Sequence, residues 1–323
     1  FGRRIITLFS IMIFIIASLG CFFSTKFEFF IFFRLLQASI AAGFLMSRVI
    51  IRDITSENEA ASMIGYVTMG MSIIPLFAPG LGGLIQMLLG WPSIFLIMSL
   101  LGLLLLLLVF RDLGETKIIK KNKNTKSSAS FINLFWEAKF WGYSFTLAFS
   151  AGTFFSFLGG APYVATKVYN LNSVVSGLVM GFPAAGYFIG NYLSGRYSKF
   201  YGIDYMALRG ILLVIFGMFI CLVITVFYRD TPYFFFGLCS FVGLGNGLII
   251  PNASVGILSV NENLSGTAGG IGNAIMIGTG AILASLTSYY LENQTSSSYL
   301  VFIMLLSGAL SYTSLYIFVL RNK

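Results

Sequence analysis

Arg34 and Gln37 are the residues whose types and spacing are best suited to chemistry in this sequence. Arg34 lies about a turn and a half inside an apolar run, and Gln37 follows at i+3, on the same face of a helix. A charge in such a run costs about 3 kcal/mol and usually faces a bundle interior or water. We therefore expect a polar site at this pair, the alternative being that Arg34 extends to the lipid head groups.

Metal and redox chemistry are not indicated by the remaining residues. The chain has no histidine, and Cys21, Cys221 and Cys239 lie in or beside apolar runs without metal-ligand spacing. We therefore expect no metal site, no disulfide and no bound cofactor. An enzyme in a membrane would need catalytic carboxylates or histidines in an interfacial loop. Most connections between the apolar runs are short and the chain has no histidine, so we do not expect an enzyme.

The chain consists mainly of long apolar runs, one of which carries Arg34 and Gln37. The 323 residues are 57% hydrophobic and 10% charged, whereas soluble domains carry about 25% charged residues. Each run is long enough to cross a bilayer. Backbone N–H and C=O groups cannot stay unpaired in lipid, so such a run must form a helix. We predict an all-α polytopic membrane protein with ten spans, at 5–23, 29–51, 60–84, 92–110, 141–164, 174–193, 207–227, 233–258, 267–290 and 299–319.

The distribution of the net charge of +9 indicates how the chain is oriented in the membrane and does not indicate a nucleic-acid-binding protein. With residue 1 placed in the cytoplasm, 16 of the 20 Lys and Arg fall in cytoplasmic segments or at the cytoplasmic ends of spans. Lys26, Lys167 and Arg229 fall outside, and Arg34 lies within a span. This positive-inside bias predicts that both ends of the chain are cytoplasmic. We expect membrane lipids as partners and no nucleic acid.

The segment 111–139 differs from the other connections, which are short. It is rich in Lys, Asn and Ser, and we interpret it as a solvated cytoplasmic linker rather than a specific lipid site. Four spans precede this linker and six follow it. The predicted domains are therefore a helical bundle at 1–110, the linker, and a six-helix bundle at 140–323.

Several motifs in the first 116 residues resemble the major facilitator superfamily. Gly2-Arg3-Arg4 is similar to the end of that family's cytoplasmic loop signature, which lies between its second and third spans. Arg34-x-x-Gln37-Ala38 resembles its fourth-span motif, and Arg48-x-x-x-Arg52-Asp53 resembles the ending typical of bicyclomycin-resistance and chloramphenicol-efflux carriers. The resemblance implies a fold of twelve spans, of which the first two would lie before residue 1.

The run 60–84 carries a further motif with a mechanical interpretation. Its Pro75-x-x-Ala78-Pro79-Gly80-x-Gly82-Gly83 is similar to the antiporter motif of the fifth span. Prolines bend a helix and glycines allow a neighbouring helix to approach closely. Gly90-Trp91 and Leu113-Gly114-Glu115 then resemble the opening and the closing of the sixth span, with Pro92 and Gly114 departing from the pattern.

The second half of the chain is less distinctive. We predict helix-packing faces at Gly243-x-Gly245-Asn246-Gly247 and at the fourfold stripe Gly266, Gly270, Ala274 and Gly278. The residues that we expect to line a cavity are polar, aromatic or flexible side chains, namely Tyr187, Asn246, Asn252, Asn273 and Met276.

The resemblance implies a proton-driven exporter of drugs or small apolar compounds in a bacterial inner membrane, working by alternating access as a monomer. Arg34 and Gln37 would serve the proton and substrate pathway, 75–83 the seam, and Gly2, Arg3 and Arg4 the gating loop. The predicted spans contain no Asp, Glu or His, so we expect these residues alone not to couple to protons. Alternatives are a metabolite carrier of the same superfamily and a non-transporting remnant of a broken gene.

Overall fold

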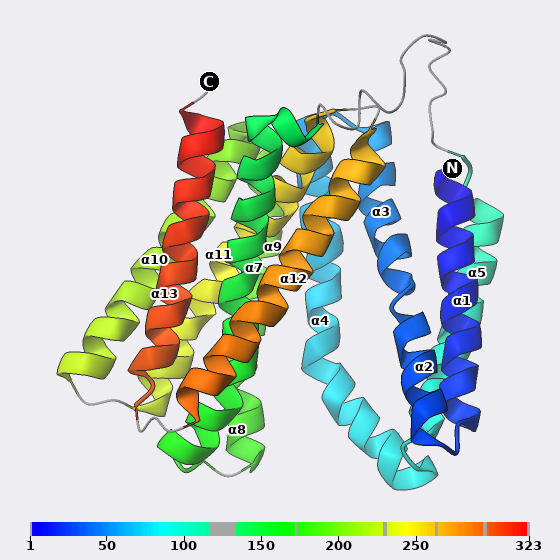
Figure 1. The fold of residues 1–323 in the computed structure, drawn as a ribbon, viewed down its shortest axis with the longest axis horizontal. Helices are drawn as coiled ribbons and strands as arrows, with labels where there is room; N and C mark the ends of the chain where they lie inside the picture. Colours follow the sequence, from blue (N-terminus) through cyan, green and yellow to red (C-terminus); the bar gives the residue numbers. More distant parts are fainter. Residues whose placement is uncertain are drawn as a thin grey trace. The chain divides into compact units, whose positions relative to one another are not determined.

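The computed structural model describes residues 2–115, 134–171, 173–228, 231–261, 264–292 and 296–321 (Figure 1). In these ranges the regular structure is helical and no strand occurs, which confirms the predicted fold class. The helices are α1 (Arg3–Phe23), α2 (Phe27–Gln37), α3 (Ile40–Ile54), α4 (Glu57–Leu89), α5 (Ser93–Asp112), α7 (Ala138–Tyr163), α8 (Ser173–Val179), α9 (Phe182–Tyr201), α10 (Ile203–Phe227), α11 (Pro232–Ser259), α12 (Ser265–Leu291) and α13 (Ser298–Leu315). Short π-helical turns, Val164–Val168 and Tyr316–Leu320, continue α7 and α13.

The chain divides into two compact units. The first consists of residues 1–54 and 77–123, and the second of residues 55–76 and 124–323. In the first unit α1 packs against α2, α3 and α5. A Cβ on Gly102 of α5 would lie 2.9 Å from Ile15, and one on Gly43 of α3 would lie 2.6 Å from the Ser10 hydroxyl. Small residues therefore set the spacing of the helices around α1.

The predicted span 29–51 consists of two helices, α2 and α3, with a short turn between them. The N–H groups of Ala38 and Ser39 donate to the carbonyls of Leu35 and Leu36 at 3.1 Å. These bonds reach back three residues instead of four, which tightens the backbone directly after Gln37. The turn therefore falls at the end of the Arg34–Gln37 motif, at a point where sequence periodicity alone predicts an unbroken helix.

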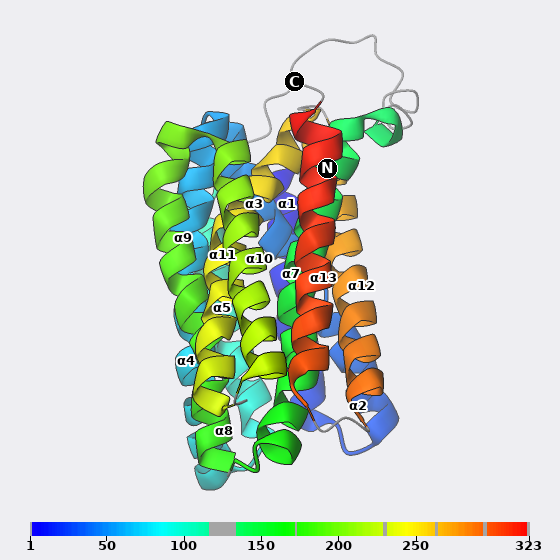
Figure 2. The ribbon, with the colours of Figure 1, turned by 90° about the vertical axis from the view of Figure 1, so that its left-hand side faces the viewer.

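In the second unit α11 lies between α9 and α10, and the three helices run side by side (Figure 2). A Cβ on Gly243 or Gly247 would meet the α9 backbone, at 1.8 Å from the Pro183 carbonyl oxygen in the first case and 2.5 Å from the Asn191 nitrogen in the second. Gly245 faces the other way, where a Cβ would lie 2.5 Å from the Gly210 carbonyl oxygen of α10. The packing face predicted at 243–247 is therefore confirmed.

The glycine stripe predicted on α12 shows no close packing at Gly266 and Gly278, and its role as a packing face stays a prediction. A Cβ on Gly266 or Gly278 would meet no atom within 4 Å in the part of the chain that the structure describes. Contact with α7 uses a different face, because a Cβ on Gly280 would lie 2.4 Å from the Phe155 ring. Gly278 and Gly280 are both small residues of the same apolar helix, so the sequence pattern alone does not show which of them faces α7.

Eight helices, searched among the described residues, are long and apolar enough to cross a membrane. They correspond to eight of the ten predicted spans, with α2 and α3 together forming one. The other two predicted spans are 60–84, within α4, and 174–193, which the structure divides into α8 and α9. Pro183 stands at the start of α9, where it has no N–H to continue a preceding helix. The count of ten and the division at 110 and 139 stay predictions.

Candidate functional site

The Arg34–Gln37 pair forms a hydrogen-bonded chain that ends on α1. The Arg34 Nη1 donates to Gln37 Oε1 at 2.8 Å, and Gln37 Nε2 donates to the Ser18 hydroxyl at 2.8 Å. Ser18 in turn donates to the Phe14 carbonyl at 2.7 Å. Ser18 is fully buried and Gln37 is 5% exposed, so the polar network enters the packed interface of α1 and α2. The shared helix face predicted for Arg34 and Gln37 is therefore confirmed.

The guanidinium of Arg34 is oriented by its neighbours, and no ion pair to it is present among the described residues. It lies 5.7 Å from the ring centroid of Phe95 on α5, within the range of a cation–π interaction. Within the described ranges no carboxylate lies at ion-pair distance from Arg34, and the side chain is exposed. An oriented guanidinium on an apolar helix can bind an anionic group or lower the pKa of an acid brought near it.

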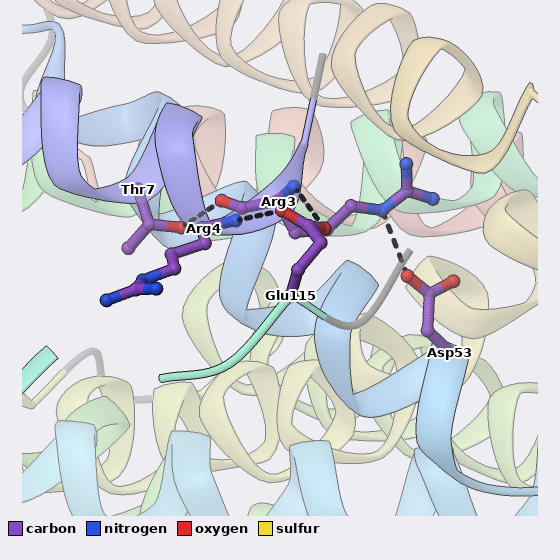
Figure 3. Close-up of polar contacts among 5 residues, drawn as sticks. All are labelled: Arg3, Arg4, Thr7, Asp53 and Glu115. Atoms are coloured by element: carbon purple, nitrogen blue, oxygen red, sulfur yellow. Dashed lines mark hydrogen bonds and ion pairs between the residues drawn. The ribbon is translucent and has the colours of Figure 1, made fainter. Parts of the chain in front are cut away.

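Arg3 and Arg4 belong to a polar cluster at the ends of α1, α3 and α5 (Figure 3). Arg3 Nε lies 2.9 Å from Asp53 Oδ2, in an ion pair whose side chains are 15% and 17% exposed. The Glu115 carboxylate accepts the backbone N–H groups of Arg3, at 2.8 Å, and of Arg4, at 3.3 Å. Glu115 therefore satisfies unpaired donors in the first turn of α1, where negative charge is favourable.

Two further contacts fix the remaining members of this cluster. The Arg4 Nη2 donates to the Phe110 carbonyl at 2.9 Å, and its guanidinium lies 5.5 Å from the Phe110 ring centroid. Gly2 lies against the Glu115 carboxylate, because a Cβ on Gly2 would collide with Oε2. Sequence reasoning placed Gly2, Arg3 and Arg4 here but missed their acidic partners. The signal was available, since Asp53 and Glu115 follow the apolar runs that contain α3 and α5.

The predicted seam at 75–83 lies within the continuous helix α4. The side chains of Pro75, Ala78, Pro79, Gly80 and Gly83 lie outside the described residues. At Gly82 a Cβ would meet no described atom within 4 Å. The role of the seam therefore stays a prediction.

The described close packing of α4 occurs earlier, where its first half lies against α9. A Cβ on Gly65 would lie 2.5 Å from the Gly195 backbone nitrogen, so the two backbones nearly touch. The Thr68 hydroxyl donates to the side-chain oxygen of Asn191, whose Nδ2 donates to the Tyr187 carbonyl at 2.8 Å. Sequence reasoning did not anticipate this contact, because it joins residues more than 120 positions apart.

The polar residues expected to line a cavity fall into two groups. Asn246 and Asn252 of α11 are 2% and 0% exposed and bond to neighbouring helices of their own bundle. Asn246 contacts Ser150 and Thr153 of α7, and Asn252 Nδ2 donates to Ser194 of α9 at 3.0 Å. The remaining residues are half-buried, namely Tyr187, Asn273 and Met276. Their assignment to a cavity stays a prediction.

Comparison with known proteins places this arrangement in a family. The profile described as Major Facilitator Superfamily matches residues 1–285. The chain therefore belongs to the major facilitator superfamily, a family of membrane transporters and not of enzymes. This confirms the family suggested by the motifs at Gly2, Arg34 and 75–83.

Individual relatives and solved structures agree with that membership. The chain is 29% identical over 206 residues to the uncharacterized MFS-type transporter YdgK of Bacillus subtilis, covering 61% of this chain and 50% of that protein. It is 29% identical over 255 residues to a bicyclomycin resistance protein homolog of Haemophilus influenzae, covering 77% of this chain and 63% of that one. The chain thus spans between half and two thirds of these relatives.

A bacterial homologue of the iron transporter ferroportin, solved in an outward-facing state, has the same fold. It superposes with a TM-score of 0.74 over 99% of this chain and 84% of its own, at 15% identity. At that identity the likeness concerns the fold alone.

Proposed function

We propose that this protein is a secondary active transporter that exports small, mostly apolar compounds by alternating access, in exchange for protons. The observation that carries the proposal is the Arg34–Gln37–Ser18 network, a polar path that leads from the Arg34 guanidinium into the α1–α2 interface. The similarity to a bicyclomycin resistance protein homolog supports drug-like compounds as the exported class.

Alternating access is supported by the way in which α4 is shared. Residues 55–76 belong to one compact unit and residues 77–123 to the other. Alternating access is largely a rigid-body movement of one bundle against the other around the substrate site, and the division of the chain into two compact units fits this. The Arg3–Asp53 ion pair and the Glu115 contacts hold the ends of three helices together within the first unit, as a rigid body requires.

The remaining parts of the proposal follow from the charge distribution and the family. We propose a monomer in a bacterial inner membrane, with both ends of this chain in the cytoplasm, surrounded by lipids and without affinity for nucleic acid. The proton gradient would be the energy source, with no bound cofactor. A guanidinium does not exchange protons in proteins, so the role of Arg34 would be to bind a substrate group or to shift the pKa of an acid near it.

The test is efflux from cells that express the protein from its native gene. Arg34→Ala should abolish export of a fluorescent apolar compound while the amount in the membrane stays normal. Arg34→Lys keeps the charge but loses the planar fork that bonds Gln37, so we expect an intermediate rate. Lys26→Ala, which removes an exposed charge at the start of α2, is the matched control.

Three outcomes separate this proposal from its alternatives. Unchanged efflux in Arg34→Ala would refute the role of that residue. Uptake or release of a polar metabolite, with no export of apolar compounds, would favour a metabolite carrier. A correctly inserted wild-type protein that moves none of a broad compound panel would favour a non-transporting remnant.

A further inference from the structure

Tyrosine rings form a continuous ladder where α9 turns into α10. α9 ends at Tyr201 and α10 begins at Ile203, with Gly202 alone between them at φ +81°, a conformation that favours glycine. The Tyr197 and Tyr201 ring centroids are 6.1 Å apart, and those of Tyr201 and Tyr205 are 5.4 Å apart with the rings nearly parallel. The tight turn therefore stacks side chains from both helices.

An arginine stands at each end of this ladder. The Arg196 guanidinium carbon lies 5.7 Å from the Tyr197 ring centroid, and its Nη1 donates to the Tyr192 hydroxyl at 3.1 Å. The Arg209 guanidinium carbon lies 4.9 Å from the Tyr205 ring centroid. Both distances are within the range of a cation–π interaction. We call the set Arg196, Tyr197, Tyr201, Tyr205 and Arg209 the Arg–Tyr ladder.

In the part of the chain that the structure describes, no acid forms an ion pair with either arginine of the ladder. Among the carboxylates on the helices around the turn, Glu59 pairs with Lys199 at 3.3 Å. Asp204 is 9% exposed and accepts a hydrogen bond from Tyr143. No carboxylate in the described ranges lies at ion-pair distance from Arg196 or Arg209, and both arginines are exposed.

The ladder also has the surroundings of a membrane interface. Tyr201 is 59% exposed, Tyr205 is 42% exposed, and the neighbouring Phe200 is 76% exposed. Tyrosine is enriched where a membrane meets water, with its ring at the level of the lipid head groups. An exposed phenylalanine beside such a belt can insert among acyl chains. The apolar span predicted at 207–227 begins two residues after Tyr205.

These features define the chemistry of a partner. A guanidinium that lies over a ring keeps its N–H edge available, and this edge matches a phosphate in bidentate geometry. Two such arginines at the ends of an aromatic platform suit a phosphate that carries acyl chains. We propose that the Arg–Tyr ladder binds the head group of an anionic phospholipid. This assigns a lipid site to the α9–α10 turn, independently of what the protein transports.

Native mass spectrometry of the purified full chain tests the proposal. The protein is titrated with phosphatidylglycerol, and with phosphatidylcholine as the zwitterionic reference, and the bound lipid is counted. Arg196→Gln/Arg209→Gln should lose roughly fivefold in phosphatidylglycerol affinity for each arginine, or about 25-fold for the pair. Lys139→Gln/Arg321→Gln removes the same net charge at two exposed positions outside the ladder and should lose clearly less affinity than the ladder pair, because both arginines of the ladder stay in place.

A second pair of variants separates the ladder from simple charge. Arg196→Lys/Arg209→Lys keeps both charges but loses the planar fork, so its affinity should fall between the wild type and the Gln pair. If the Gln pair does not fold, the Lys pair decides. Three results would overturn the proposal. The first is an equal loss of affinity in the Gln pair and in the Lys139/Arg321 control, and the second is equal binding of phosphatidylcholine. The third is wild-type affinity in the Gln pair or, if that pair does not fold, in the Lys pair.

Discussion

The hydroxyl of Tyr143 on α7 donates a 2.5 Å hydrogen bond to Oδ1 of Asp204 on α10. Asp204 is 9% exposed and stands in the first turn of α10, where the helix end favours a negative charge. Gly256 of α11 lies against the tyrosine ring, since a Cβ there would be 2.5 Å from a ring carbon. Three helices of the second unit therefore meet at this pair.

Tyr143→Phe should destabilise the protein, because it removes a donor to a buried carboxylate and leaves the ring in place. We expect the free energy of unfolding to fall by about 1–3 kcal/mol. Cys21, Cys221 and Cys239 are all buried, so thermal unfolding can be followed by their reaction with a thiol-specific fluorophore. Tyr316→Phe, at an exposed tyrosine, is the control. A Tyr143→Phe melting temperature equal to that of the wild type would contradict this prediction.

Gly65→Ala should disturb the contact of α4 with α9. The added Cβ would lie 2.5 Å from the Gly195 nitrogen, so the helices must separate, at a cost of about 1–3 kcal/mol. Gly70→Ala in the same helix is a matched control, since a Cβ there meets no described atom within 4 Å. The control should be neutral or gain up to about 1 kcal/mol from helix propensity. Equal melting temperatures of the two variants would show that the close approach is absent in the membrane.

Glu115→Ala should loosen the first turn of α1. The variant loses the acceptor for the N–H groups of Arg3 and Arg4, an interaction comparable to an N-cap at about 1 kcal/mol. We expect roughly fivefold faster amide exchange in the peptide covering residues 2–10, measured by mass spectrometry. Asp112→Ala, at an exposed acid near the end of α5, should leave that peptide unchanged. Unchanged exchange in Glu115→Ala would exclude the capping role.

The Glu59–Lys199 contact should make stability depend on acid pH. The hydrogen bond from Ser56, followed by the interaction with Lys199, lowers the pKa of Glu59 below its ordinary value. The ionised carboxylate therefore stabilises the fold above its unfolded pKa, and this contribution disappears as pH falls through the lower folded pKa. Glu59→Gln should accordingly show a smaller loss of melting temperature than the wild type between pH 7 and pH 3. Parallel pH profiles would contradict this.

Much of the helical framework could be predicted because lipid imposes a simple rule on sequence. Runs of about 20 apolar residues must be helices, and the eight membrane-length helices lie where such runs were placed. The breaks inside predicted spans were harder. The break before α9 lies inside the predicted span 174–193, although Gly181 and Pro183 stand at the start of α9. The turn at Ala38 and Ser39 carries no proline or glycine, so the sequence does not predict it.

The sequence predicts a site residue where a charged side chain lies in an apolar run. It does not predict contacts between residues that are far apart in the sequence. Arg34 stands out as a charge in an apolar run, and Gln37 follows from helical spacing. Asp204 precedes the predicted span at 207–227, so the sequence does not predict its bond to Tyr143. α10 begins at Ile203, and Asp204 is 9% exposed. Pairing between α4 and α9 depends on tertiary packing, which one sequence does not encode locally.

The division of α4 between the two compact units has a consequence for fragment complementation. Residues 55–76 pack with the second unit although they precede residues 77–123 of the first. Cutting the chain in the segment 111–139 would therefore not yield two self-contained halves. The N-terminal piece would keep the Gly65 surface, and the C-terminal piece would keep the Gly195 surface against which it packs. The pieces should copurify, each supplying a helix face that the other needs.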